Sequence, residues 1–362
     1  MKYRKELDKV NAYKPGKPIE ELKREKKLAN IYKLASNEIP FKPAYIKEAV
    51  NRELKNINRY PESSCFYLRN KLAKNLKVKP NSVIFGNGSD EIITLALKAF
   101  IEKGDEAIIA FPSFLIYQIQ AKIFGAKIVK VPLKNYSYCL DDLSKKITKK
   151  TKIIFIANPD NPTGTYVNQK EMNSFLKKVP KDVLIFFDEA YFEFAPGDFP
   201  NSIKMLKARK NMIITRTFSK AYGLAGLRIG YGITSKQIAQ LLNKIREPFN
   251  VNRIAQASAQ AGLENKGFVK DVVNFVNKEK SYFYKNFDRL GIFYIKSATN
   301  FVLVDFKKST KKLYEYMLKR GVIIRELQGW GLKNFFRVTV GLHFQNRKFI
   351  KLLDSYIKGA KK

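Results

Sequence analysis

The segment TFSKAYGLAGLRIGY, residues 217–231, combines residue types suited to covalent chemistry on a phosphorylated ligand. Lys220 follows an apolar run, has Ser219 beside it and is followed eight residues later by Arg228. A lysine amine can form a Schiff base, and an arginine with a hydroxyl can hold a phosphate. A lone lysine after a strand is usually a surface residue, so the prediction depends on the whole segment. Its three glycines indicate a close approach of the backbone to a bound group: Gly223, Gly226 and Gly230.

A carboxylate ends the most apolar run of the chain, in the sequence FFDEAY at residues 186–191. Burying Asp188 there is costly unless a cation pairs with it. The protonated ring nitrogen of pyridoxal 5'-phosphate (PLP) would be such a partner, and the charged ring then acts as an electron sink. Tyr191, three residues on, could bond the ring hydroxyl. Taken alone, the acidic pair is better explained as a cap of the next helix.

Two predicted turns supply further polar groups. In ANPDNPTG, residues 157–164, prolines and a glycine fix the turn, so Asn161 is aimed and can donate to the ring oxygen of PLP. In FGNGSDE, residues 85–91, a glycine-containing turn leads into a helix whose N-terminus suits a phosphate. Ordinary turns and helix capping explain both motifs equally well. The phosphate contacts of the second turn would come from Gly88, Ser89 and Asp90.

The elements that must position these residues follow an α/β pattern. From about residue 81 to about residue 232, short apolar strands alternate with helix-like segments, which predicts a mainly parallel sheet. The C-terminal third indicates a smaller α+β domain. We expect residues 1–40 to form an N-terminal arm joining that domain, residues 41–245 a large PLP-binding domain, and residues 246–362 the small domain. The expected buried strands are 82–86, 106–111, 127–133, 152–159, 183–190 and 212–217.

Composition excludes several classes of protein. The 362 residues, 45% of them hydrophobic, suffice for two domains with a common core and argue against disorder. The apolar runs are too short to cross a membrane, and the charged N-terminus does not resemble a signal peptide, so we expect a cytoplasmic location. Cys65 and Cys139 give neither a disulfide framework nor metal-ligand spacing. A single histidine, His343, excludes a His-rich metal site and is interpreted as a structural residue near a strand end.

The formal net charge of +37 favours anionic partners. Its lysines are spread from Lys2 to Lys362, without a basic tail or a recognisable nucleic-acid module. A lysine-rich solvated surface explains the charge better than binding to nucleic acid does, so no nucleic-acid partner is expected. The same field would still attract an anionic substrate.

Together the four motifs resemble those of fold type I PLP enzymes, specifically the class I and II aminotransferases. The resemblance covers nearly the whole chain and is closest to the histidinol-phosphate aminotransferases within that family. Further similar stretches are AYKPG at 12–16, LASNE at 34–38, RYP at 59–61, REPFNVN at 246–252, TNFVL at 299–303 and RVTVG at 337–341.

The resemblance implies a role for each cofactor-binding residue. Lys220 would carry PLP as a Schiff base and move the proton at the substrate Cα, and Asp188 would pair with the pyridine nitrogen. Phe114 would stack on the ring. Tyr60 would reach the phosphate of the neighbouring subunit's cofactor, which implies a homodimer with shared active sites. Tyr191 and Asn161 would bond the ring hydroxyl, and the phosphate would be held by Gly88, Ser89, Asp90, Ser219 and Arg228.

Substrate recognition transfers through four matching positions, which are Tyr13, Asn37, Arg325 and Arg337. Two arginines and a phenol suit a dianion such as a phosphate. The chain departs from the family pattern at Ile39, where an asparagine is usual, at Lys42 in place of a glycine, and at Leu342 in place of a small hydroxyl residue. These changes indicate either drift at the rim of the site or a changed substrate.

Three enzymatic functions remain open on these residues. The first is transamination of histidinol phosphate with glutamate as donor, in amino-acid biosynthesis. The second is transamination of a small phosphorylated amino alcohol, such as serinol phosphate, to dihydroxyacetone phosphate. The third is decarboxylation of phosphoserine or phosphothreonine. A PLP-binding regulator of nucleic acid would require a reading module for which the chain has no room.

Overall fold

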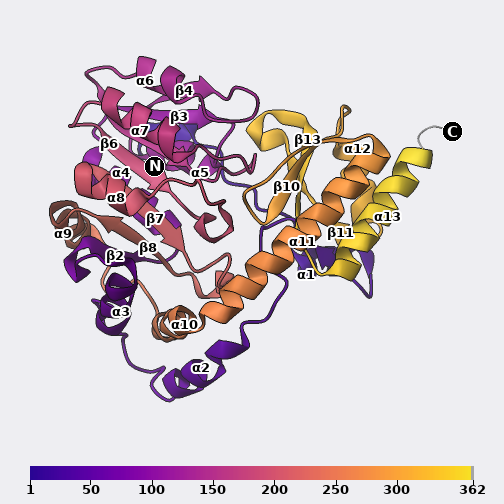
Figure 1. Ribbon diagram of the computed structural model, residues 1–362, viewed down its shortest axis with the longest axis horizontal. Helices are drawn as coiled ribbons and strands as arrows, with labels where there is room; N and C mark the ends of the chain where they lie inside the picture. Colours follow the sequence, from indigo (N-terminus) through magenta and orange to yellow (C-terminus); the bar gives the residue numbers. More distant parts are fainter. Residues whose placement is uncertain (360–362) are drawn as a thin grey trace.

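The computed structural model describes residues 1–359, in which a large sheet with helices on both faces lies beside a smaller sheet (Figure 1). The large sheet has seven strands in the order β2-β8-β7-β6-β5-β3-β4. All neighbours in it pair in parallel except β8, which is antiparallel to both β2 and β7. Its strands are β2 (Val83–Gly86), β3 (Glu106–Phe111), β4 (Lys127–Pro132), β5 (Thr151–Ala157), β6 (Leu184–Asp188), β7 (Met212–Thr217) and β8 (Gly230–Thr234).

The central strands form because both of their faces are buried. β6 and β7 are buried at every residue, and β5 is buried at all but one. Near-continuous runs of Ile, Val and Phe are the pattern that a parallel sheet covered on both sides requires. The predicted α/β fold with a mainly parallel sheet is therefore confirmed.

Helices cover the two faces of the large sheet through separate apolar clusters. One face is covered by α4 (Ser89–Phe100), α5 (Leu115–Ile123) and α9 (Lys236–Ile245). The other face is covered by α3 (Phe66–Leu76), α6 (Leu140–Lys145), α7 (Gln169–Lys178), α8 (Ser202–Ala208) and α10 (Arg253–Glu264). Away from the sheet, α2 (Lys47–Leu54) contacts α10.

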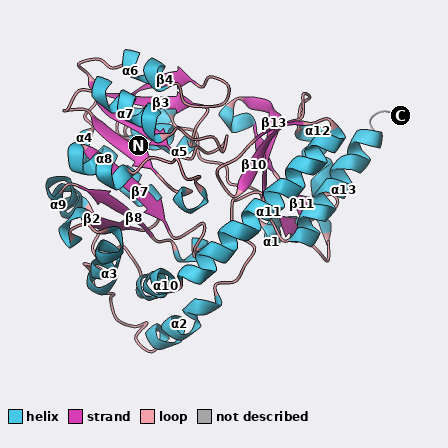
Figure 2. Cartoon of the chain, viewed as in Figure 1, coloured by secondary structure: helices cyan, strands magenta, loops and turns pink. Residues whose placement is uncertain are grey.

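The smaller unit is a four-stranded antiparallel sheet in the order β12-β13-β10-β9 (Figure 2). Its strands are β9 (Phe293–Ile295), β10 (Phe301–Asp305), β12 (Arg325–Leu327) and β13 (Leu332–Thr339). Apolar residues of the sheet pack against α11 (Lys266–Leu290), α12 (Lys311–Leu318) and α13 (His343–Gly359). In Figure 1, α11 runs from beside α10 towards α12, and so links the two units.

The N-terminal residues return to the smaller unit. Strand β1 (Tyr32–Lys33) pairs in parallel with β11 (Val322–Ile323), while α1 (Ile19–Lys26) buries Leu22 in the same apolar cluster as Ile323. The predicted limits of the domains stay predictions, and residues 360–362 lie outside the described part.

Short 3-10 turns connect several of these elements. They are η1 (Lys5–Lys9), η2 (Ala44–Ile46), η3 (Pro80–Ser82), η4 (Phe192–Phe194), η5 (Ala225–Leu227) and η6 (Gln328–Trp330).

His343, expected near the end of a strand, is the first residue of α13 and lies four residues beyond the end of β13. Its Nδ1 lies 3.0 Å from Oε1 of the buried Glu279, which also accepts from Asn346 at 2.8 Å. This pairing joins α11 to α13. Among the described residues, no group of His, Cys, Asp and Glu has the arrangement of a metal site. No helix in that part of the chain is long and apolar enough to cross a membrane.

Candidate active site

A cavity of about 290 Å³ opens where β5, β6 and β7 end. Residues from β12 and β13 complete its wall, together with two N-terminal stretches at 13–16 and 35–37. The structure brings all the predicted site residues to this cavity except Gly88 and Tyr60. Those at the cavity are Tyr13, Asn37, Ser89, Asp90, Phe114, Asn161, Asp188, Tyr191, Ser219, Lys220, Arg228, Arg325 and Arg337.

Lys220 follows β7 and presents its amine to the cavity. Its Nζ lies 5.7 Å from the centre of the Tyr191 ring, and no ion pair joins it to a carboxylate among residues 1–359. Burial lowers the pKa of Lys220 to about 8, and the nearby charge of Arg337 acts in the same direction. About a tenth of the amine is therefore neutral at pH 7, far more than for a surface lysine, and the neutral form is the one that a nucleophile or a base requires.

Asp188 ends β6, and its carboxylate is held by three donors. Its Oδ2 accepts from the Tyr117 hydroxyl at 2.6 Å, and its Oδ1 accepts from Thr215 Oγ1 and the Ala190 N–H, each at 3.1 Å. Burial raises the pKa of Asp188 to about 6, while the bonds from Tyr117 and Thr215 oppose that rise. A cation in the cavity would lower this pKa by pairing with the carboxylate.

The turn before α4 meets the loop before β8 at close range. Gly88 has φ +80°, and a Cβ on it would lie 2.7 Å from Arg228 Nη2. A Cβ on Gly230 would lie 2.5 Å from the Ser89 backbone nitrogen, so the glycine at this position is required by backbone packing. Arg228 itself adopts the left-handed conformation at φ 54°, which is a strained state for a side chain of this size.

The N–H groups at the start of α4 and the Arg228 guanidinium therefore lie together, a combination that suits a phosphate. The Asp90 carboxylate lies 3.5 Å from Arg228 Nη2. Because a carboxylate repels a phosphate, the backbone of Asp90 is the part suited to contact it.

Arg337 crosses from the small sheet to the predicted cofactor residues. Its guanidinium donates to Asn161 Oδ1 through Nη1, and to the Ala35 carbonyl at 2.9 Å through Nη2. Because Asn161 accepts through its oxygen, the Nδ2 donor of its amide is unused by residues 1–359. That donor is the group predicted to face the ring hydroxyl of PLP.

Asn37 and Tyr191 form a buried pair. Asn37 Nδ2 donates to the Tyr191 hydroxyl at 2.7 Å, while Asn37 Oδ1 accepts from Thr339 Oγ1 at 3.1 Å. The Asn37 side chain is thus engaged with protein, and it orients Tyr191. Burial raises the pKa of Tyr191 to about 12, so the phenol stays protonated and can donate.

Arg325 and Arg337 face each other across paired strands, because their Cα atoms are partners in the β12–β13 register. Arg325 donates to the Lys14 carbonyl, and its guanidinium lies over the rings of Tyr13 and Trp330, at 5.8 and 5.1 Å. Neither arginine is paired with a carboxylate within residues 1–359. The Nε of Arg337 is buried without a hydrogen-bond partner in this part of the chain.

Tyr60 lies away from the cavity that its own chain forms. Its side chain is 78% exposed, and its ring stacks on Phe249 with the centres 4.6 Å apart.

Four further residues singled out from the sequence do not line the cavity: Gly226, Ile39, Lys42 and Leu342. Gly226 was expected to mark a close backbone approach, but a Cβ there would meet nothing within 4 Å. Ile39 packs against Gly223, 3.0 Å from the position of a Cβ, and does not line the cavity. Lys42 is exposed and Leu342 half-buried, and neither lines the cavity either.

The sequence interpretation missed Tyr117, whose hydroxyl bonds Asp188. The one signal available was its spacing: Tyr117 lies three residues after Phe114, and their rings meet edge-to-face at 5.4 Å. Thr215 was also missed, because its orientation towards Asp188 depends on the pairing of β6 with β7.

Lys220, which is half-buried, follows β7, and Asp188 ends the neighbouring strand β6. With the phosphate-suited start of α4, they form the site of a fold type I PLP enzyme. The model of the family "Aminotransferase class I and II" matches residues 29–351. The chain belongs to the class I and II aminotransferase family and is a PLP-dependent transferase.

Relatives narrow the similarity further. The chain is 42% identical to a histidinol-phosphate aminotransferase of Caldicellulosiruptor saccharolyticus, over 98% of this chain and 100% of the relative. It superposes with a TM-score of 0.92 on the histidinol-phosphate aminotransferase of Sinorhizobium meliloti in complex with PLP, at 26% identity, covering 99% and 98% of the two chains. It also resembles an L-threonine-O-3-phosphate decarboxylase of Porphyromonas gingivalis, with a TM-score of 0.81 and 25% identity, covering 91% and 100% of the chains.

Proposed function

We propose that this chain transfers the amino group of a small phosphorylated amine, with histidinol phosphate the first candidate and glutamate paired with 2-oxoglutarate as the second substrate couple. The two histidinol-phosphate aminotransferases named above support this substrate. The observation that carries the proposal is the pair Arg325 and Arg337, which line the cavity without a carboxylate partner within residues 1–359.

Burial makes that unpaired charge informative. Arg337 is 5% exposed, and burial lowers its pKa to about 10, so it remains charged at neutral pH. A buried charge without a counter-ion is costly, and an anionic substrate would remove that cost. Two guanidinium groups beside the Tyr13 phenol suit a phosphate dianion better than a single carboxylate.

The residues of the cavity fit PLP. The absence of a Cβ at Gly88 and Gly230 lets the Arg228 guanidinium and the start of α4 lie close together, and these two groups suit its phosphate. When bound, PLP supplies an electron sink that labilises the bonds at the substrate Cα. Asp188 would hold the ring nitrogen in its protonated form, and Tyr191 and Asn161 would orient the ring through its hydroxyl. Phe114, from the start of α5, would limit movement of the ring.

The amine of Lys220 would bind the cofactor and then act as a base. A pKa near 8 leaves it able both to accept a proton from the substrate Cα and to return one nearby. Arg325 and Arg337 would fix the far end of the substrate, so that one Cα bond stays aligned for cleavage. Cleavage of the Cα–H bond leads to transamination, whereas cleavage of the bond from Cα to a carboxyl group leads to decarboxylation.

We further propose that the active unit is a cytoplasmic homodimer in which Tyr60 reaches the phosphate of the neighbouring subunit's cofactor. The exposed phenol of Tyr60 and its position away from its own cavity support this. Four other large apolar side chains close to Tyr60 in sequence are exposed and could be buried in such an interface: Leu54, Ile57, Phe66 and Tyr67.

Decarboxylation of phosphothreonine or phosphoserine is the second candidate, because the decarboxylase named above shares the fold and the arginine pair would also hold its substrate's phosphate. Transamination of serinol phosphate is a third. Mass spectrometry separates all of them. The PLP-loaded protein is incubated with each amine and 2-oxoglutarate. A keto product from histidinol phosphate, formed together with glutamate, supports the proposal. Release of carbon dioxide with retention of the amine would overturn it.

A further inference from the structure

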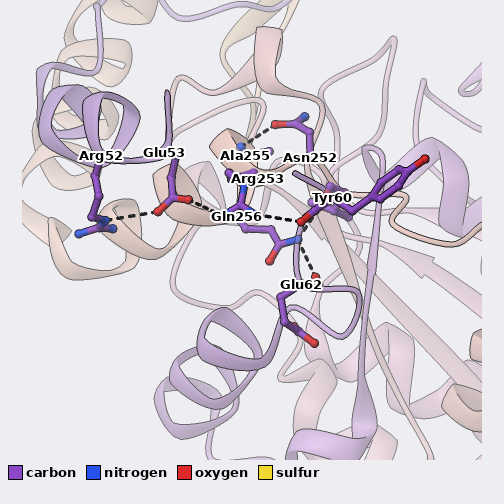
Figure 3. A network of polar contacts seen from close by, with 9 residues as sticks. Arg52, Glu53, Tyr60, Glu62, Asn252, Arg253, Ala255 and Gln256 are labelled. Carbon is purple, nitrogen blue, oxygen red and sulfur yellow. Dashed lines mark hydrogen bonds and ion pairs between the residues drawn. The ribbon is translucent and has the colours of Figure 1, made fainter. Parts of the chain in front are cut away.

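The segment carrying Tyr60, residues 60–63, accepts hydrogen bonds from side chains of residues 246–256. Three backbone carbonyls of the segment, nearly consecutive, each accept a hydrogen bond from that stretch. Figure 3 shows the two bonds to Tyr60 and Glu62. Such a loop has little freedom to move, because its acceptors are fixed independently of its own side chains. The bonds run from Arg253 Nη2 to Tyr60 O at 2.9 Å, from Gln256 Nε2 to Glu62 O at 3.0 Å, and from Arg246 Nη2 to Ser63 O at 2.8 Å.

Arg253 makes the one of these three hydrogen bonds that reaches Tyr60 itself, and its guanidinium is held in turn by Glu53. Its Nη1 lies 3.0 Å from Oε2 of Glu53, and the two side chains are only 23% and 16% exposed. The other oxygen of Glu53 lies 3.3 Å from Nε of Arg52, whose side chain is 69% exposed. Arg253 thus connects the end of α2 to the Tyr60 backbone, whereas Arg52 pairs only with the carboxylate.

The base of this brace is rigid. Arg253 is the first residue of α10, whose N-cap Asn252 accepts from the Ala255 N–H at 2.8 Å. Ala255 and Ala259 are completely buried in the core of the large sheet. The guanidinium therefore projects from a fixed helix end.

The Tyr60 ring contacts Phe249 and points away from the hydrogen bonds that hold its backbone (Figure 3). It stacks on Phe249 at an interplanar angle of 19°. Phe249 adopts a left-handed conformation at φ 56°, a strained state for an aromatic residue. Asn250 holds this conformation from the next position, since its Nδ2 donates to Glu91 at 2.8 Å and to the Phe85 carbonyl at 3.2 Å.

We propose that Arg253, braced by Glu53, is a positioning residue that fixes the phenol of Tyr60 for the phosphate bound by the neighbouring subunit. This inference rests on the proposed function, which assigns Tyr60 to the neighbour's cofactor. A donor on a flexible loop must be ordered when it binds, and that cost weakens binding. A loop already ordered by Arg253 avoids most of the cost, so the affinity for PLP depends on a residue that never touches it.

The test is a double-mutant cycle between Arg253→Met and Tyr60→Phe, with Arg52→Met as the matched control. The quantity measured is the dissociation constant of PLP from the cofactor-free dimer, by fluorescence titration, with sedimentation to check the assembly. Tyr60→Phe is expected to raise this constant about tenfold, the usual effect of losing one hydrogen bond to a charged group. Arg253→Met is expected to raise it about three- to tenfold, and the double variant to match Tyr60→Phe within about twofold. Arg52→Met should leave it unchanged.

Each outcome separates the two hypotheses. If Tyr60→Phe leaves PLP affinity unchanged, the assignment of Tyr60 to the neighbour's cofactor is wrong, and this inference fails with it. If Tyr60→Phe weakens binding but Arg253→Met does not, or if their effects multiply, only the positioning role is wrong. Should Arg253→Met fail to fold, Glu53→Gln replaces it in the cycle, because it keeps the shape of the brace and removes only its charge. A smaller loss that does not add to that of Tyr60→Phe supports the proposal, and an additive loss or none overturns it.

Discussion

Lys220 and Lys280 are two lysines of this chain whose amines have a pKa lowered by burial, but only Lys220 lines the cavity. Burial lowers its pKa to about 8, and the neighbouring Arg337 acts in the same direction. A surface lysine titrates near ~10.4 and is almost fully charged at neutral pH. Lys280 donates to the Ser297 carbonyl at 2.6 Å, so its position in the cavity, together with the lowered pKa, distinguishes Lys220 as the nucleophile.

The depressed pKa of Lys220 predicts the pH dependence of cofactor attachment. Only the neutral amine attacks, so the rate of PLP attachment to the cofactor-free protein should rise about tenfold per pH unit below about pH 8 and level off above it. Stopped-flow absorbance measures this rate. A rate still rising steeply towards pH 10 would show an ordinary lysine. Lys220→Ala, the control, should bind PLP without the absorption band of a covalently attached cofactor.

Asp188→Asn should separate cofactor binding from catalysis. The phosphate contacts and Lys220 are unchanged in this variant, so it should retain PLP, but activity should fall at least about a hundredfold because the ring nitrogen loses its charged partner. Loss of deuterium from the substrate Cα, followed by mass spectrometry, measures the affected step. Tyr117→Phe, which removes one donor from the same carboxylate, should have a milder effect. Near-normal exchange in Asp188→Asn would exclude the role assigned to Asp188.

At the scale of elements, the apolar strands were readable from the sequence because burial on two faces demands continuous Ile, Val and Phe. Strand β8 was not singled out, since Gly230 and Gly232 weaken its strand pattern and its antiparallel direction follows from the topology alone. For the same reason, the Tyr117–Asp188 bond and the opposition of Arg325 to Arg337 were not foreseen. The motifs identified the residues that carry the chemistry. Which side chains lie beside those residues depends on strand register and helix orientation, and these depend on long-range packing.

The meeting of β8 with the turn before α4 gives a prediction of its own. Gly230→Ala would place a Cβ 2.5 Å from the Ser89 nitrogen, so strand and turn must separate, and PLP affinity should fall about tenfold or more. Gly226→Ala is the matched control, because a Cβ there meets nothing within 4 Å. Equilibrium dialysis of PLP against both variants measures the difference. Equal affinities would show that the close approach has no part in binding the phosphate.

For the whole molecule, the net charge of +37 acts at long range on an anionic substrate. Salt screens such fields over a Debye length of about 10 Å at 0.1 M ionic strength. We therefore expect kcat/KM for the phosphorylated amine to fall several-fold between about 0.05 M and about 0.5 M salt, while kcat changes little. Steady-state kinetics across that range provides the measurement. A parallel fall in kcat would instead indicate that salt disturbs the fold or the assembly.

The pairing of strands across the sequence also sets an order in time. β2 pairs with β8, which ends at Thr234. The turn at Gly88 and the start of α4 can therefore meet Gly230 only after synthesis has reached β8. Asn37 bonds Thr339, which lies in β13 together with Arg337. The part of the cavity predicted to bind the substrate therefore forms last. At translation rates of about 5–20 residues per second, synthesis from Thr234 to Thr339 takes about 5–20 seconds. The residues predicted to bind PLP all precede Arg325 and Arg337 in the sequence, so a nascent chain contains them before it contains either arginine predicted to hold the substrate.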